Sequence, residues 1–170
     1  MNIIQRIGSW FRRVLNHKKT VVVPEPPTPI IDNGVYITGD QVKAIIVATL
    51  GKRLASRSYV HPFDKIYYCP SKEYVEHLLA VDETDKLTYV AEKGDCDNFA
   101  AQLWAVFGRD AWRDGEKRAS HCAGPVFGRL PHPHAMNWVI TDDLKLRLIE
   151  PQTDAWKEWG DKFSIWLMAA

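Results

Sequence analysis

The feature that most constrains the fold of this chain is a run of four prolines within residues 21–32. Proline lacks a backbone N–H and fixes φ, so this stretch excludes regular helix and favours an extended, stiff linker. The 170-residue length suits one domain of ordinary size plus a tail. We therefore predict a short N-terminal unit over residues 1–20, the linker over residues 21–32, and one globular domain over residues 33–170.

Residues 2–16 repeat apolar side chains at steps of three and four, which is the period of an amphipathic helix. The opposite face is basic, and no acidic residue occurs before Glu25. A basic amphipathic helix is typical of a segment that lies on a membrane surface or in a groove of a partner protein. Packing back onto its own domain is the alternative. The net charge of +1 gives no general attraction to nucleic acid, so we expect no nucleic-acid partner.

The cysteine count and the apolar runs bear on location. Three cysteines do not make a disulfide framework, so we expect free thiols in a reducing compartment such as the cytoplasm. One disulfide among Cys69, Cys96 and Cys122 is the alternative. No run of about 20 apolar residues is present, and arginines interrupt the apolar residues of the N-terminus. We predict neither a spanning helix nor a signal peptide.

Caps and periodicity place helices early in the domain and strands late. Thr38 and Gln41 match a capping box, and Ser71 is a typical N-cap. We expect helices over residues 39–53, 71–81 and 96–108, and strands over residues 65–69, 122–130, 135–141 and 145–149. The fold class this order predicts is α+β, with N-terminal helices followed by an antiparallel sheet.

Cys96 is the first candidate for chemistry, because it falls in the first turn of the predicted helix 96–108. Unpaired N–H groups and the positive end of the helix dipole stabilise a thiolate and an oxyanion there. Asp95 and Asp97 oppose this effect, because neighbouring negative charge disfavours the thiolate. An inert, buried thiol is the alternative.

His134 and Glu150 are the second and third candidates. His134 begins a predicted strand and Glu150 ends the next one, with the turn signal Asp142-Asp143 between them. A hairpin centred at residue 142 brings the two side chains together across the strand pair. A carboxylate beside an imidazole orients the ring and stabilises its charged form. The alternatives are a surface histidine and a solvated strand end.

Four short motifs occur in order: Tyr-Cys-Pro-Ser at 68–71, Asp-Cys-Asp-Asn-Phe-Ala at 95–100, His-Ala-Met-Asn-Trp at 134–138 and Glu-Pro-Gln at 150–152. This order resembles the agglutinin C-terminal family, whose type member is the C-terminal domain of the Marasmius oreades agglutinin and which has stand-alone relatives in bacteria and their phages. The resemblance implies a papain-like fold and a Cys-His-Glu triad of Cys96, His134 and Glu150. It also implies calcium dependence, for which Asp95 and Asp97 are the expected carboxylate ligands.

Asn137 and Gln152 lie inside the matching motifs and are candidates for hydrogen bonding to a substrate or an oxyanion. Asn137 alternates to the face opposite His134, which favours a structural role.

The function predicted from these residues is a cysteine peptidase that forms a thioacyl-enzyme intermediate on a peptide or protein substrate, with no cofactor required for the chemistry itself. Two alternatives remain open: a peptidoglycan amidase or endopeptidase of a phage or bacterium, and a non-catalytic phage or structural binding protein that keeps the fold.

Overall fold

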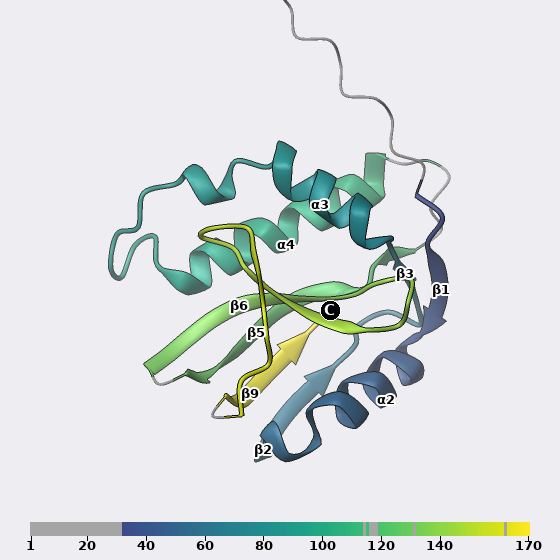
Figure 1. The fold of residues 1–170 in the computed structure, drawn as a ribbon, viewed down its shortest axis with the longest axis horizontal. Coiled ribbons are helices and arrows are strands. Elements are labelled where there is room, and N and C mark those ends of the chain that lie inside the picture. The colour runs from purple at the N-terminus through teal and green to yellow at the C-terminus, as the bar shows by residue number, and fades with distance from the viewer. Residues whose placement is uncertain (1–31, 114, 116–118, 131, 162) are drawn as a thin grey trace, which may run out of the picture.

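The computed structural model describes residues 32–170 apart from 114, 116–118, 131 and 162 (Figure 1). The predicted N-terminal helix and nearly all of the predicted linker therefore lie outside the described residues. The helical elements of the described part are α2 (Gly39–Leu50), η1 (Gly51–Arg53), α3 (Lys72–Val81), η2 (Thr84–Lys86) and α4 (Cys96–Arg113). The strands there are β1 (Val35–Thr38), β2 (Leu54–His61), β3 (Ile66–Cys69), β4 (Ser120–His121), β5 (Ala123–Leu130), β6 (His132–Ile140), β7 (Leu146–Glu150), β8 (Ala155–Lys157) and β9 (Ser164–Ala169).

The helix starts follow the predicted caps. Thr38 and Gln41 form a complete capping box: the Thr38 hydroxyl accepts a hydrogen bond from the Gln41 N–H, and the Gln41 side chain accepts one from the Thr38 N–H. The Ser71 hydroxyl accepts from the Tyr74 N–H and caps α3. The predicted helix over residues 39–53 ends in a 3-10 turn, η1, and α4 continues past Gly108 to Arg113.

Strand order differs from the predicted antiparallel sheet. Six strands form one sheet in the order β2-β9-β5-β6-β7-β8, and β1, β3 and β4 form a small second sheet. β2 pairs parallel to β9, and β3 pairs parallel to β4. Three strands also precede α3. The predicted order of helices first and antiparallel sheet second is therefore wrong, because sequence patterns do not reveal which distant strands pair.

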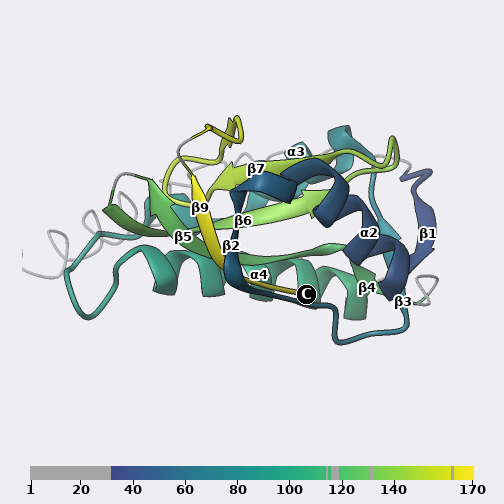
Figure 2. The ribbon, with the colours of Figure 1, turned by 90° about the horizontal axis from the view of Figure 1, so that it is seen from below.

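The large sheet lies between two helical layers, with α2 on one face and α3 and α4 on the other (Figures 1 and 2). Alternate side chains of β6 point to the two helical layers. Met136 and Trp138 pack in the core cluster that contains the buried residues of α2, and Val139 packs in the cluster that contains those of α3 and α4. The predicted alternation of β6 is confirmed, and β6 contributes side chains to both core clusters.

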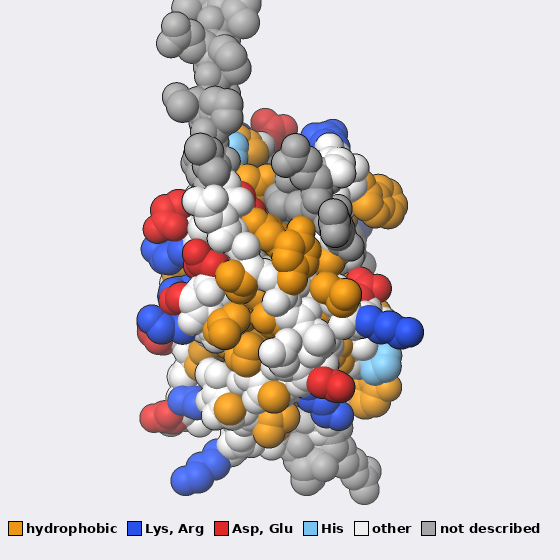
Figure 3. Space-filling model, turned by 90° about the vertical axis from the view of Figure 1, so that its right-hand side faces the viewer, with side chains coloured by type: hydrophobic (Ala, Val, Ile, Leu, Met, Phe, Trp, Pro, Cys, Tyr) orange, Lys and Arg blue, Asp and Glu red, His pale blue; other side chains and the backbone are white. Residues whose placement is uncertain are grey.

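The end of the molecule that carries β1 presents apolar side chains to solvent (Figure 3). Val35, Tyr36 and Ile66, from β1 and β3, are among the exposed large apolar residues. Of the helices in the part of the chain that the structure describes, none has the length and apolar character to cross a bilayer.

Candidate functional site

The structure brings His134 and Glu150 together. His134 Nε2 and Glu150 Oε2 lie 2.8 Å apart, and the two side chains are 26% and 14% exposed. Ile140 pairs with Leu146, so the β6–β7 hairpin is centred on residue 143, one residue beyond the predicted centre. Continuing this register by one pair from Asn137 and Ile149 puts Glu150 across from Met136, diagonal to His134, and a diagonal pair of long side chains still meets.

The backbone after β7 holds the Glu150 carboxylate on its other side. Glu150 Oε1 accepts a hydrogen bond from the backbone N–H of Gln152 at 3.4 Å, and the Glu150 carbonyl accepts one from the Thr153 N–H at 3.2 Å. Gln152 thus reaches this carboxylate through its main chain rather than through its side-chain amide.

Cys96 is the first residue of α4 and is half-buried as a free thiol. Figure 1 shows the start of α4 and the start of β6 at the same end of the molecule. Within the described part of the chain, no hydrogen bond joins the Cys96 sulfur to the His134 ring. The structure therefore joins two of the three predicted residues and places the third at a helix start.

The two acids beside Cys96 lie close to one another. A hydrogen bond with the Asp95 carboxyl group raises the pKa of Asp97 above its ordinary value, with smaller contributions from burial and from the Asp95 charge. Asp97 is exposed and Asp95 is half-buried.

The calcium expectation rests on Asp95 and Asp97. In the part of the chain that the structure describes, these acids do not belong to a group of three or more His, Cys, Asp or Glu side chains that could hold a metal ion. Ca²⁺ takes about six to eight oxygen ligands, and two neighbouring carboxyl groups fall well short of that number. The calcium expectation stays a prediction of the resemblance.

Asn137 ties the sheet to α4. Its side chain is fully buried, and its Nδ2 donates a hydrogen bond to the Ala100 carbonyl at 2.9 Å. The contact agrees with the predicted orientation of Asn137 away from the His134 face.

Sequence patterns gave no sign of a second histidine–carboxylate pair. His121 Nε2 lies 2.7 Å from Asp110 Oδ2, and the His121 side chain is 0% exposed. The Tyr74 hydroxyl donates to the same carboxylate. The three residues come from β4, α4 and α3, and no spacing in the chain signals that they meet.

The turn after β7 contains a half-buried acid with a positive φ, Asp154. Its φ is 54°, and its Oδ1 is buried with no hydrogen-bond partner. Burial raises the pKa of Asp154 to about 6, and the charges of Asp85 and Asp82 add to the effect.

Because the folded protein holds the Asp154 proton more tightly than the unfolded chain does, the contribution of this group to stability falls as pH rises from about 4 through about 6. We expect Asp154→Asn to stabilise the fold at pH 7.5 by about 1 kcal/mol, a value reduced for solvent screening of a partly buried group. The same variant should match the parent at pH 4. Urea unfolding at both pH values measures this, and an equal effect at both would contradict it.

The chain belongs to the family described as "Ricin-type beta-trefoil lectin C-terminal domain", which it matches over residues 37–163. This agrees with the resemblance to the agglutinin C-terminal family. Solved structures share this fold. One is titled "PSL1a-E64 complex", with 18% sequence identity, a TM-score of 0.69 and coverage of 79% of this chain and 51% of that chain.

The second is a Polyporus squamosus lectin bound to the epitope Neu5Acα2-6Galβ1-4GlcNAc, with 18% identity, a TM-score of 0.65 and coverage of 78% of this chain and 49% of that one. This chain therefore spans about half the length of the structures it matches. No curated protein sequence matches it.

These comparisons overturn the predicted fold name and activity. The predicted papain-like fold is wrong, because the fold is shared with the Polyporus squamosus lectin structure. The predicted cysteine peptidase acting on peptides is also wrong, because the matched family and that structure are named as lectins. Cys96, His134 and Glu150 occur in the expected order, but that order alone does not establish hydrolysis. The alternative of a non-catalytic binding protein agrees better with the findings.

Proposed function

We propose that this chain is a carbohydrate-binding domain that acts by binding and not by bond cleavage. The observation that carries the proposal is membership of the lectin C-terminal domain family over residues 37–163. The glycan in the matched Polyporus squamosus structure supports the choice of carbohydrate as the ligand class.

The residues first assigned to catalysis then take structural or ligand-positioning roles. The His134–Glu150 pair links the start of β6 to the end of β7, and the turn at Gln152 holds the same carboxylate. In this proposal Cys96 is a helix-start residue whose thiol is not needed. The three free cysteines support a reducing compartment, such as the cytoplasm or a phage particle assembled there.

The test is glycan binding by the full chain. An array screen comes first, followed by titration calorimetry with two probes, the sialylated trisaccharide Neu5Acα2-6Galβ1-4GlcNAc and the neutral disaccharide Galβ1-4GlcNAc. We expect saturable binding to at least one glycan. We also expect Cys96→Ser, which replaces the thiol by a group of similar size, to change the dissociation constant by less than about twofold.

Two results would count against the proposal. One is an array and calorimetry that detect no glycan. The other is a glycan affinity that disappears in Cys96→Ser while the variant remains folded by circular dichroism.

A further inference from the structure

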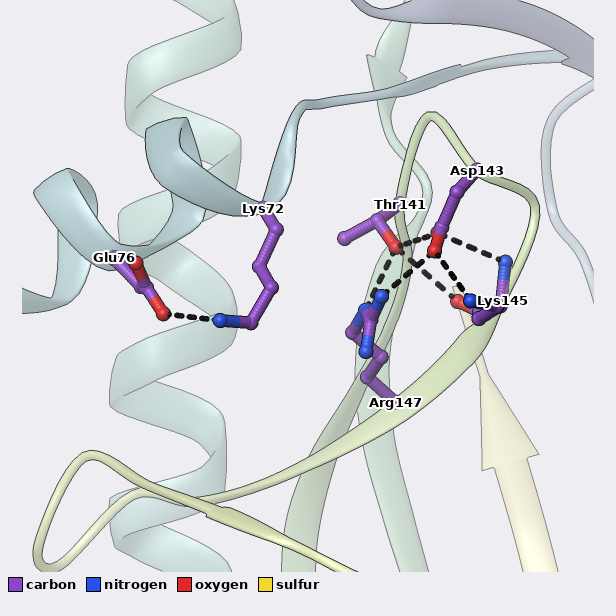
Figure 4. A network of polar contacts seen from close by, with 6 residues as sticks. All are labelled: Lys72, Glu76, Thr141, Asp143, Lys145 and Arg147. Atoms are coloured by element: carbon purple, nitrogen blue, oxygen red, sulfur yellow. Dashed lines mark hydrogen bonds and ion pairs between the residues drawn. The ribbon is translucent and has the colours of Figure 1, made fainter.

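The pocket around Trp156 has charged walls whose cations are already matched. It has a volume of about 580 Å³ and is lined by the β6–β7 hairpin, the start of α3 and the segment from β8 to residue 159. Three of its cations pair with acids of the fold (Figure 4): Lys72 with Glu76 at 2.6 Å, Arg147 with Asp143 at 2.8 Å and Lys145 with Asp143 at 3.3 Å. A different surface, on α4, is apolar and open.

The helix α4 carries a second apolar stripe besides the one that it buries. The buried stripe includes Leu103 and Phe107, which pack in the core cluster with β6 and β7. A surface helix usually needs one apolar stripe, with polar residues on its opposite face. The second stripe of α4 recurs at steps of three and four and lines a groove instead of the core: Ala101, Trp104, Ala105, Gly108 and Trp112.

This second stripe forms one wall of an apolar groove of about 370 Å³, the α4 groove, whose other lining includes Phe63 and Ala170. Figure 2 shows the end of the chain, marked C, beside α4. The backbone N–H of Phe63 donates to the Ala170 carbonyl at 2.9 Å, which fixes this wall. Trp112 is 88% exposed, Phe63 60% and Trp104 36%. Large apolar side chains gathered around one open groove are typical of a docking surface.

The charge around the α4 groove suits a basic occupant. Among the described residues, its lining contains the acid Asp64 and neither Lys nor Arg. The charge of the chain is also divided unevenly. Residues 1–31 contain five Lys or Arg and one acid, Glu25, so residues 32–170 contain three more acids than Lys and Arg. The N-terminal segment and the rest of the chain therefore attract one another.

The described part of the chain begins close to this groove. The Tyr68 hydroxyl donates to the Asp32 carbonyl at 3.2 Å, and the centre of the Tyr68 ring lies 5.8 Å from that of His121, which lines the α4 groove. The intervening residues 17–31, at about 3.1 Å each when extended, can span up to about 45 Å. A tether of this kind gives an effective concentration in the millimolar range, so a contact too weak to hold two separate molecules is still populated.

We propose that the α4 groove binds residues 2–16 of the same chain. The apolar residues of this segment recur at helical steps, and no acid lies among them: Ile3, Ile4, Ile7, Trp10, Phe11, Val14 and Leu15. As an amphipathic helix in a groove, the segment packs this apolar face against Trp104, Trp112 and Phe63, and both surfaces leave water together. The inference goes beyond the proposed carbohydrate binding and does not depend on it.

The experiment is photocrosslinking of the full chain with p-benzoylphenylalanine in place of Phe11. Unlabelled and ¹⁵N-labelled chains are mixed, vesicles of phosphatidylglycerol and phosphatidylcholine are present, and the products are mapped by mass spectrometry. We expect Phe11 to crosslink to the α4 segment that holds Trp104 and Trp112, or to Phe63, within one chain.

Paired variants separate the apolar face from added charge. Ile7→Glu with Val14→Glu places two carboxylates on the apolar face and should lower the yield of this crosslink about tenfold. Ser9→Glu with Asn16→Glu adds the same charge on the opposite helical face and should keep the yield within about twofold.

A second pair of variants tests the groove itself. Trp112→Gln should also lower the crosslink yield, and its 88% exposure makes it safe for folding. Trp166→Gln, at a 42% exposed tryptophan of β9 outside the α4 groove, should leave the yield unchanged.

Three results would overturn the proposal. Crosslinks that join unlabelled to labelled chains would make a second copy the occupant, and crosslinks to lipid alone would make a membrane the partner of residues 2–16. Intramolecular crosslinks that map away from the α4 groove, or that survive both Ile7→Glu with Val14→Glu and Trp112→Gln, would also exclude this docking.

Discussion

Gly124→Ala is expected to cost about 3 kcal/mol or more of stability, because the site has no room for a methyl group. Gly124 lies in β5 across from Trp138, and a Cβ built there overlaps the Ala169 carbonyl oxygen. That carbonyl belongs to the backbone of β9, so the clash cannot be relieved by a side-chain rotation. Closing the sheet at β9 requires glycine at this position. Urea unfolding followed by tryptophan fluorescence measures the loss.

Gly108→Ala is the matched control for this prediction. Gly108 lies inside α4, and among the described residues no atom outside the neighbouring backbone of its own helix comes within 4 Å of a Cβ built there. Alanine at this helical position should stabilise the fold by about 0.5–1 kcal/mol. A Gly124→Ala protein as stable as the parent would show that β9 does not close against β5 as described.

Trp138→Ala is expected to lower the free energy of unfolding by about 3–5 kcal/mol, the usual cost of emptying a large buried aromatic site. Trp138 is 1% exposed and is among the largest fully buried side chains. It packs in the cluster that joins β6 to Val42 and Ile46 of α2. Because β6 also carries His134, this variant should loosen the α2 layer and the strand that carries the His134–Glu150 pair together. Urea unfolding at pH 7 measures the change.

Trp138→Phe separates packing from the indole N–H. Trp138 Nε1 is buried without a hydrogen-bond partner, so phenylalanine removes an unsatisfied polar group while it keeps most of the apolar volume. We expect it to lose about 1–2 kcal/mol. Equal losses for the alanine and phenylalanine variants would contradict the view that volume at this site matters most.

Local elements were predictable from neighbouring residues. The Thr38–Gln41 capping box, the Ser71 cap and the alternation of Met136, Trp138 and Val139 each depend on contacts within a few positions of the chain. The His134–Glu150 contact was also foreseen, although the hairpin centre was displaced by one residue. A hairpin is the one tertiary contact whose geometry a short sequence largely encodes.

The pairings that define the fold were not predictable in this way. β2 lies parallel to β9, more than 100 residues away in the chain, and neither was assigned as a strand. The His121–Asp110–Tyr74 contact and the pocket around Trp156 likewise join separate elements. The predicted peptidase activity was also wrong. It was inferred from the order of Cys96, His134 and Glu150 in the chain, whereas the family to which the chain belongs is named for lectins.

Residue order alone accounts for where the helices begin, which face of β6 enters which core, and why His134 meets Glu150. These outcomes follow from steric and hydrogen-bonding rules that act over a few residues. Only tertiary packing decided which strands pair. It also placed Asp154 near the charges of Asp82 and Asp85, and it brought Lys72, Arg147 and Trp156 to one pocket. The free energy of those contacts depends on burying surfaces that are far apart in the chain, and no local pattern records which surfaces will meet.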